Sequence, residues 1–334
     1  MDMNSRQMEY VLAVAEECSF SKAAKRLVIA QPSLSQYIQN VEKELGTALF
    51  DRATTPLQLT QAGEVYVKTA REILDLESQM HQQLEDLENL RTGRLRVGIS
   101  PYLSAYLMPA VFARFYQQFP GVDVTLTEDI TVELEKHLLA GDIELALTTF
   151  PQADNPKLHY ISLLREDILL AVPETFCENV EEPYEVRGGN WPTTRLENFK
   201  NTPFVTLKSD QLLYKMMMEL CKKAGFTPKV RLECRSLEAA HAMAAAGIGA
   251  TLLPYTMAHL VEARGQKVKN LRYYRLQHLF PEREMVAIYR KERYLTKAML
   301  RLIDIMQELL EGVSAKPLLV LGQTEKKEEE EEEE

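Results

Sequence analysis

Hydrophobic residues in the first 46 positions recur every three or four residues, in three short runs. This spacing places the apolar side chains of each run on one face, so the segment predicts three short amphipathic helices. Ser19 or Ser21 can cap the second helix, Pro32 suits the first turn of the third, and Gly46 suits its end. The residues expected to face the core are Met8, Val11, Leu12, Ala15, Ala23, Ala24, Leu27, Leu34, Ile38, Val41 and Leu45.

The pattern changes twice over the next 45 residues. Residues 47–60 contain short β-prone pieces around Pro56, which predict a two-stranded hairpin or wing. From Glu64 to Arg91 there is no proline or glycine, which favours one long helix. Its heptad seam comprises Tyr66, Thr69, Ile73, Leu76, Met80, Gln83, Leu87 and Leu90. The seam is interrupted by the polar residues Thr69 and Gln83, and Leu84 lies beside the second interruption. A lone helix would expose this seam, so we expect a partner helix, most simply from a second copy of the chain.

Strand and helix patterns alternate from residue 93 onward. Strands are expected near 94–100, 122–129 and 143–149, with helices between them, and a similar series occupies 165–254. This order is typical of right-handed βαβ crossovers and of a mainly parallel sheet, so the chain predicts two α/β lobes. A strand at 283–291 and a helix at 295–310 follow, and we expect that helix to pack on its own lobe rather than to serve as a heptad partner.

Length and composition fit a protein of two or three folded units. The chain has 334 residues, of which 46% are hydrophobic and 26% charged, and it contains no apolar run long enough to cross a membrane. The start MDMNSRQMEY lacks an export signal, so the cytoplasm is the expected compartment. Four scattered cysteines without a C-x-x-C pair indicate reduced thiols rather than a redox or metal site.

The net charge of −10 argues at first against a nucleic-acid partner. Residues 325–334 hold eight acids and two lysines, however, so this tail supplies −6 and leaves −4 for the rest. Such a run of like charges repels itself and is expected to be disordered.

Motifs for the commoner kinds of enzyme are absent. There is no phosphate-binding loop, no nucleophile elbow, no H-E-x-x-H and no G-x-G-x-x-G after a strand, and the six histidines are isolated from one another in sequence. A catalytic set can assemble from distant residues, so this lowers the odds of an enzyme without excluding one. No cofactor and no metal are indicated.

The third helix has a polar face with two interpretations. If its apolar residues face the core, the opposite face carries Ser33, Ser35, Gln36 and Gln39, with Gln31 at the N-terminal end. Serine and glutamine at these positions suit a recognition helix in the major groove, but a polar helix face is more often only solvated. Residues 1–63 hold six basic and seven acidic residues, so phosphate binding would need a local set: Lys22, Lys25, Arg26 and Arg52.

The run from Ser19 to Gly63 resembles the N-terminal winged helix-turn-helix of LysR-type transcriptional regulators. The matching positions are Phe20, Ala23, Ala24, Leu27, Gln31, Pro32, Ser33, Ser35, Ile38, Glu42, Leu45, Gly46, Leu49, Phe50, Arg52, Leu59, Thr60 and Gly63. The resemblance extends more weakly over nearly the whole chain and implies an α/β protein with a long linker helix and a two-lobed effector domain like that of type 2 periplasmic binding proteins.

The resemblance implies a division of the chain into four parts. These are a DNA-binding domain at 1–63, a linker and dimerisation helix at 64–92, an effector-binding domain at 93–314 and a disordered acidic tail at 315–334. Lobe I is expected at about 93–165 and 271–314, and lobe II at about 166–270. The chain departs from the family in a wing without a basic residue, in a loop insertion around Trp191 and in the tail.

The resemblance also implies two sites. Contacts to double-stranded DNA are assigned to Ser21, Lys22, Gln31, Ser33, Ser35, Gln36, Gln39 and Arg52, with specificity expected in Gln31, Ser33, Ser35 and Gln36. A small effector, expected to be anionic, would lie between the lobes at strand ends and helix starts. The residues carried over to it are Ser100, Tyr102, Thr148, Thr149, Thr206, Lys208 and Ser209, each of which could equally be a helix cap or turn residue.

The sequence therefore predicts a homodimeric or homotetrameric regulator of transcription that does not bind membranes. Two other classes remain open at this stage. A solute-binding protein would share the lobes but would need an export signal and would have no use for residues 1–92. An enzyme on the same scaffold would need a catalytic set in the cleft, and the strand ends offer no evident acid–base pair.

Overall fold

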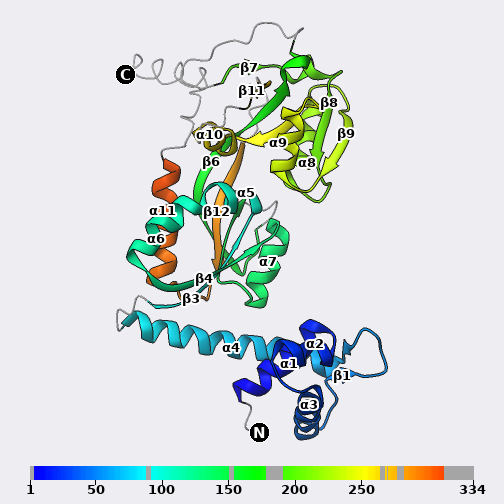
Figure 1. The fold of residues 1–334 in the computed structure, drawn as a ribbon, viewed down its shortest axis with the longest axis vertical. Helices are drawn as coiled ribbons and strands as arrows, with labels where there is room; N and C mark the ends of the chain where they lie inside the picture. Colours follow the sequence, from blue (N-terminus) through cyan, green and yellow to red (C-terminus); the bar gives the residue numbers. More distant parts are fainter. Residues whose placement is uncertain are drawn as a thin grey trace, which may run out of the picture.

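The N-terminal part of the protein is a winged helix-turn-helix joined to a long helix (Figure 1). The computed structural model describes residues 4–87, 92–149, 154–177, 191–263, 268, 270–276 and 282–311. The elements of this part are α1 (Ser5–Glu17), α2 (Phe20–Arg26), α3 (Gln31–Leu45), β1 (Phe50–Asp51), β2 (Gln58–Leu59) and α4 (Gln61–Leu87). The predicted three helices and hairpin are confirmed.

Local sequence explains where these helices begin and end. Asn4 and Gln7 form a reciprocal capping box at the start of α1, and the Ser19 side chain accepts a hydrogen bond from the Lys22 amide at the start of α2. Gly46 ends α3 in the left-handed conformation with φ of 71°. The apolar faces then close on one another, and the three side chains Val11, Leu34 and Ile38 are fully buried.

The turn between α2 and α3 places a valine where glycine is usual. Val28 has φ of 56°, its amide donates to Lys25 O, and the Ile29 amide donates to Ala24 O. This is the hydrogen-bond pattern of a Schellman helix end, whose left-handed residue is normally glycine because a β-branched side chain is strained there. The Val28 side chain is also 88% exposed. The turn fixes the entry of the chain into α3 despite this local strain.

Helix α4 exposes an apolar stripe that follows the predicted seam only in part. Tyr66 is buried in the core of the winged helix-turn-helix, so the seam was wrong at its first position. The exposed apolar side chains of α4 are Val65, Ile73, Leu76, Met80 and Leu84. Thr69 and Gln83 are also exposed, whereas the Leu87 side chain and Leu90 lie outside the described residues.

The remainder of the described chain contains an eight-stranded mixed sheet and a two-stranded parallel sheet. The larger sheet has the order β4-β3-β5-β12-β6-β11-β7, and β10 also pairs with β6. Its strands are β3 (Thr92–Ile99), β4 (Gly121–Glu128), β5 (Leu145–Thr149), β6 (Leu158–Pro173), β7 (Thr193–Thr194), β10 (Thr251–Pro254), β11 (Leu271–Leu276) and β12 (Glu282–Arg290). The smaller sheet pairs β8 (Pro203–Leu207) with β9 (Lys229–Cys234).

The prediction of a mainly parallel sheet was wrong for the middle of the large sheet. β3 pairs in parallel with β4 and β5, as expected from the βαβ pattern. β12, however, lies antiparallel between β5 and β6, and β10 and β11 are antiparallel to β6. The reason is that β12 returns from the far end of the chain and inserts beside the long strand β6.

Strand β6 runs through both lobes and therefore defines them. Its first half pairs with β12 beside β3, β4 and β5, which make lobe I. Its second half pairs with β10 and β11, which lie with β7 and near β8 and β9 in lobe II (Figure 1). β11, expected in lobe I, thus lies in lobe II, and of the last two strands only β12 lies in lobe I.

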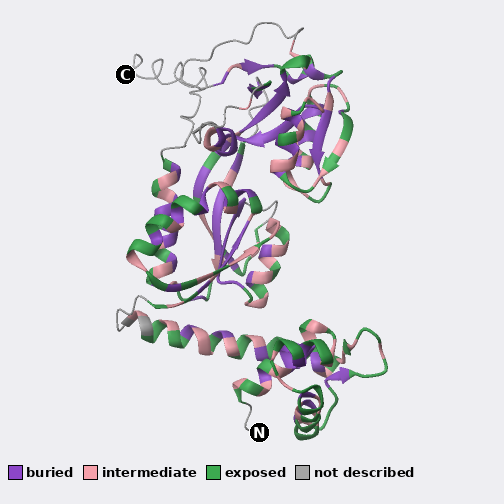
Figure 2. Ribbon diagram, in the orientation of Figure 1, coloured by how far each residue is buried: buried purple, intermediate pink, exposed green. Residues whose placement is uncertain are grey.

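Helices cover both lobes and bury their apolar faces (Figure 2). Those on lobe I are α5 (Pro101–Tyr106), α6 (Met108–Gln118), α7 (Thr131–Ala140) and α11 (Lys297–Glu311). Those on lobe II are α8 (Leu212–Lys223), α9 (Leu237–Ala245) and α10 (Tyr255–Ala263). Lobe II also contains a short 3-10 helix, η2 (Leu196–Phe199). Met299, Leu302 and Met306 of α11 are fully buried, so the prediction that this helix packs on its own lobe is confirmed.

The predicted loop insertion is described only in part. Residues 178–190 and the acidic tail lie outside the described residues. Trp191 itself is buried in lobe II, where its ring lies 4.8 Å from that of Tyr255 and 5.8 Å from that of Tyr273. The end of the insertion is therefore anchored in the lobe II core.

Candidate functional site

The polar face of α3 points away from the core. Leu34, Ile38 and Val41 are buried, whereas Gln31, Ser33, Gln36 and Gln39 are exposed and Ser35 is half-buried. The Gln36 amide donates to Asn40 Oδ1 one turn on, at 3.2 Å, which holds the two side chains side by side. The face thus presents hydroxyl and amide groups that can both donate and accept hydrogen bonds, as base edges in the major groove require.

The basic side chains near this face differ in whether they are paired. Ser21, Lys22 and Lys25 are exposed on α2, and the two lysines make no ion pair with the described residues. Arg26, by contrast, donates to Glu16 Oε2 at 2.6 Å. Of the basic residues of α2, the two lysines are therefore the ones whose charge is available to a phosphate.

Arg52 on the wing is also paired. It donates to Glu42 Oε2 at 2.9 Å and lies over the Phe20 ring at 5.2 Å. Glu42 Oε1 also accepts from the Leu49 and Phe50 amides, so this carboxylate joins the wing to α3. Arg52 therefore holds the wing against α2 and α3, in addition to any role in phosphate binding.

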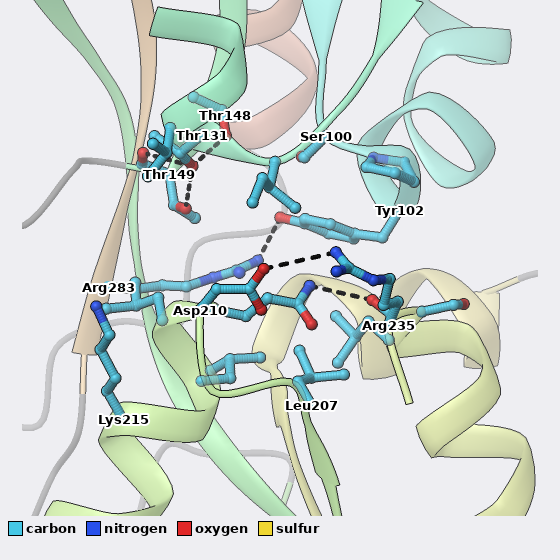
Figure 3. A pocket seen from close by; sticks show the side chains of 18 of the residues that line it. Ser100, Tyr102, Thr131, Thr148, Thr149, Leu207, Asp210, Lys215, Arg235 and Arg283 are labelled. Atoms are coloured by element: carbon cyan, nitrogen blue, oxygen red, sulfur yellow. Dashed lines mark hydrogen bonds and ion pairs between the residues drawn. The ribbon is translucent and has the colours of Figure 1, made fainter. Parts of the chain in front are cut away.

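A cavity of about 340 Å³ lies between the two lobes (Figure 3). Lobe I contributes its strand ends and helix starts, and lobe II contributes the segments that follow β8 and β9. The lining includes Ser100, Tyr102, Ile130, Thr131, Thr148 and Thr149 from lobe I, Leu207, Asp210, Gln211, Lys215, Arg235 and Leu237 from lobe II, and Arg283 from β12.

Four hydroxyl groups meet on the lobe I wall of this cavity. Thr131 Oγ1, at the start of α7, lies 2.8 Å from Thr148 Oγ1 and 3.3 Å from Thr149 Oγ1. The Ser100 hydroxyl is buried at the start of α5 and makes no hydrogen bond with the described part of the protein. A buried hydroxyl without a partner is costly, so this wall is suited to a hydrogen-bonding ligand.

The lobe II wall carries a charged pair at the cavity rim. Arg235 lies 3.5 Å from the Asp210 carboxylate, and the Gln211 side chain donates to the Arg235 carbonyl oxygen at 3.0 Å (Figure 3). Both charged side chains are exposed, so the pair is screened by water and can rearrange at small cost. The charges on this wall balance each other unless a ligand separates them.

A buried charge network forms the floor of the cavity, across the boundary between the lobes. Arg283 Nε donates to Glu166 Oε1 at 2.7 Å, and another Arg283 nitrogen donates to the Tyr102 hydroxyl. The second Glu166 oxygen accepts from the Thr256 amide at 2.8 Å and from its hydroxyl at 2.6 Å, at the start of α10. The network thus ties α5 and β12 of lobe I to α10 of lobe II.

The protonation of this network follows from its burial. Burial disfavours the Arg283 charge, but Glu166 and Tyr102 outweigh that effect and raise the pKa of the guanidinium. Burial also raises the pKa of the Tyr102 hydroxyl well above its usual range. Arg283 is therefore charged and already balanced by Glu166, which leaves no net charge on the cavity floor.

The structure brings together four of the seven residues assigned to the effector. Ser100, Tyr102, Thr148 and Thr149 line the cavity. The other three do not line it: Thr206 is buried in β8, Lys208 pairs with Glu233 at 3.2 Å, and Ser209 is exposed.

Among the lining residues that the sequence analysis did not assign, three polar ones are instructive: Thr131, Arg235 and Arg283. Thr131 and Arg235 follow β4 and β9, so the strand-end rule that suggested Ser100 applies to them as well. Arg283 lies at the start of β12, and only the insertion of that strand beside β6 brings it to the cavity.

Two family models together cover nearly all of the described chain. The model of the bacterial regulatory helix-turn-helix protein of the lysR family matches residues 5–64, and that of the LysR substrate binding domain matches residues 88–311. The chain belongs to the LysR family of transcriptional regulators. Membership places this LysR-family protein among regulators of transcription rather than enzymes.

Individual relatives agree with the family over most of the chain. The Bacillus subtilis protein YcgK, described as an uncharacterized HTH-type transcriptional regulator, is 29% identical over 92% of this chain and 95% of its own length. The HTH-type transcriptional regulator AlsR of the same organism is 27% identical over 87% of this chain and 92% of its own.

Solved structures share the fold of this LysR-family protein. A cysteine-to-aspartate variant of full-length OxyR from Pseudomonas aeruginosa aligns with a TM-score of 0.68 and 21% identity, covering 94% of this chain and 97% of its own. Full-length CbnR, solved in complex with its target DNA, aligns with a TM-score of 0.61 and 24% identity, covering 92% and 99%. Among the described residues, no helix is long and apolar enough to cross a membrane, and no cluster of three potential metal ligands occurs.

Proposed function

We propose that this LysR-family regulator binds operator DNA through the exposed face of α3. The observation that carries the proposal is the division of α3 into a buried apolar side and an exposed side with Ser33 and Gln36. The glutamine side chain can make two hydrogen bonds to adenine, accepting through its amide oxygen and donating through its amide nitrogen, and serine can bond a base or a phosphate. CbnR, which shares the fold, is a LysR-family regulator solved on its target DNA. The cytoplasm, where operator DNA is accessible, is the proposed compartment.

The active form is proposed to be a dimer, or a pair of dimers. Five apolar side chains of α4 are exposed in one chain, which is unfavourable unless another helix covers them. Pairing of two α4 helices would join two DNA-binding heads, and such dimers contact half-sites about one helical turn, or roughly 34 Å, apart.

The cavity between the lobes is proposed to bind a small organic anion with an apolar body. The hydroxyls of Ser100, Thr131 and Thr149 would hydrogen-bond a carboxylate on the lobe I wall, and Ile130 and Leu237 would contact the body. Because Glu166 already balances Arg283, a single negative charge fits this cavity better than several.

Replacing Ser33 or Gln36 by alanine is expected to weaken operator binding by about tenfold to a hundredfold, which corresponds to one lost base contact of about 1–3 kcal/mol. Binding to random DNA should stay nearly constant, because phosphate contacts do not depend on sequence. Both affinities would be measured by fluorescence anisotropy at one salt concentration.

Gln117→Ala, an exposed glutamine on α6 far from the head, is the control for this experiment. It should leave both affinities unchanged. Equal losses on operator and random DNA would show that the α3 residue contacts phosphate, and the proposed base readout would be wrong.

Small carboxylates that stabilise the full-length parent in a thermal-shift screen are expected to stabilise Ser100→Ala and Thr149→Ala less. A ligand at 100 times its Kd adds about 2.7 kcal/mol of stability, so a tenfold loss of affinity gives a smaller shift in Tm. Ser209→Ala is the matched control, because Ser209 is an exposed hydroxyl outside the cavity. Equal shifts in all four proteins would place the ligand elsewhere.

A further inference from the structure

Two arginines line the cavity between the lobes, and each is paired with a carboxylate of the protein. Arg283, on the floor, pairs with Glu166 at 2.7 Å, and both side chains are buried. Arg235, on the lobe II wall, pairs with Asp210 at 3.5 Å, and their side chains are 72% and 45% exposed. Both pairs are formally neutral, but only the exposed pair can exchange its carboxylate for one from a ligand at small cost.

The loops that carry Asp210 and Arg235 are held together by Gln211. Asp210 lies between β8 and α8, and Arg235 lies between β9 and α9. The Gln211 side chain donates to the Arg235 carbonyl oxygen at 3.0 Å and accepts from the Lys208 amide at 3.2 Å, so it bridges the ends of two paired strands. The position of Arg235 next to Asp210 is therefore built into lobe II.

This pair faces the wall that carries the hydroxyl groups. In Figure 3 the Asp210 carboxylate and the Arg235 guanidinium extend from lobe II toward the lobe I residue Tyr102. The hydroxyls of Thr131 and Thr149 line the same cavity from lobe I. A ligand with one carboxylate on those hydroxyls would direct its other end toward the pair.

The remaining charged residues of the lobe II wall do not change this balance. Lys215 and Glu238 also line the cavity, and their formal charges cancel. Glu238 accepts from the Ser236 hydroxyl at 2.7 Å, in the first turn of its own helix, so it is engaged locally. Within the described lining, Asp210 is therefore the acid that decides whether the Arg235 guanidinium can bind a ligand.

We propose that Asp210 restricts the effector to molecules with a single negative charge, because it occupies the guanidinium that a second carboxylate would need. This inference rests on the proposed function, since it concerns the same cavity. The second carboxylate of a dianion would meet Arg235 and Asp210 together, and repulsion between two carboxylates offsets the attraction of one guanidinium. Without the Asp210 charge, Arg235 can bind that carboxylate through two parallel N–H donors.

The test compares the full-length parent with Asp210→Asn, which keeps the size of the side chain and removes its charge. The probes are linear dicarboxylates of about four to eight carbons and their monomethyl esters, a size that the cavity can enclose. Each dicarboxylate differs from its ester by one charge at nearly the same length. Titration calorimetry at neutral pH should show dicarboxylates binding about tenfold more tightly to Asp210→Asn than to the parent, and esters binding within about threefold.

Glu219→Gln is the matched control for the loss of one negative charge. Glu219 is an exposed carboxylate of α8 that pairs with Lys223 at 2.8 Å and does not line the cavity. This variant should keep the parent's preference for esters. Combining Asp210→Asn with Arg235→Gln should abolish the gain, because no guanidinium then remains for the second carboxylate.

Salt separates repulsion from a change of shape. The gain of Asp210→Asn should shrink between about 0.05 M and 1 M salt, because ions screen exposed charges. A gain that does not depend on salt would arise from the shape of asparagine, and it would overturn the proposed role of the Asp210 charge.

The other outcomes distinguish the role of Asp210 from the function of the cavity. An unchanged ratio of dicarboxylate to ester affinity in Asp210→Asn overturns the proposal, as does an equal gain in Glu219→Gln or a gain that persists without Arg235. A parent that binds none of the esters contradicts the proposed effector class instead. In that case, dicarboxylate binding by Asp210→Asn that Arg235→Gln abolishes still supports the role of Asp210, and its absence overturns that role too.

Discussion

Glu166→Ala is expected to lower the free energy of unfolding by about 3–5 kcal/mol, because it leaves the Arg283 charge buried without its partner. Glu166 is 2% exposed and accepts bonds from Arg283 and from the Thr256 amide and hydroxyl. All these donors would lose their acceptor together. Urea unfolding followed by the fluorescence of Trp191, the single tryptophan of the chain and a buried residue of lobe II, would measure the loss.

Glu174→Ala is the matched control, because Glu174 pairs with Arg272 while both side chains remain about half exposed. This substitution should lower the free energy of unfolding by no more than about 1 kcal/mol, as for other surface ion pairs. The double variant Glu166→Gln with Arg283→Met should cost less than Glu166→Ala alone, because no charge then stays uncompensated. If Glu166→Ala unfolds at the urea concentration of the control, the network does not bind the lobes together.

The Glu166 network also shows what the sequence could not reveal about the cavity. Glu166 and Arg283 are 117 residues apart, and no spacing rule connects two charged residues on different strands. They meet because β12 inserts antiparallel beside β6, a pairing that the alternation of strands and helices does not encode. By contrast, the sequence could place Ser100 and Thr149 at one edge of the sheet, because Ser100 follows β3 and Thr149 ends β5, its parallel neighbour.

The same distinction holds for the helices. Periodicity predicted α1, α2 and α3 because their caps, apolar spacing and Gly46 are all local. It also predicted that α4 is long, but not which part of the protein each face of this helix contacts. Tyr66 falls in the heptad seam, yet it lies where α4 still packs against the head. Asp75 and Gln79 look like ordinary solvated positions until Arg293 is placed beside them.

Gly63→Ala is expected to destabilise the winged helix-turn-helix by about 3 kcal/mol, because a methyl group there has no space. A Cβ at this position would lie 2.0 Å from the Leu49 carbonyl oxygen and 3.0 Å from its carbon. Leu49 cannot move aside easily, since its amide bonds to Glu42 and its carbonyl accepts from the Thr60 amide. The gain in helix propensity from alanine, about 1 kcal/mol, is too small to compensate for the clash.

Hydrogen exchange of the full-length protein locates this effect. Amides of α1 and α3 should lose about two orders of magnitude of protection in Gly63→Ala, while those of β3 and β5 keep theirs. Gly46→Ala separates the clash from backbone conformation: Gly46 has φ of 71° and no neighbouring atom within 4 Å of a Cβ, so alanine there should cost only about 1 kcal/mol. If both substitutions lower the stability of the winged helix-turn-helix equally, Leu49 moves aside to make room for the methyl group. Close packing of α4 against the wing would then not explain the glycine at position 63.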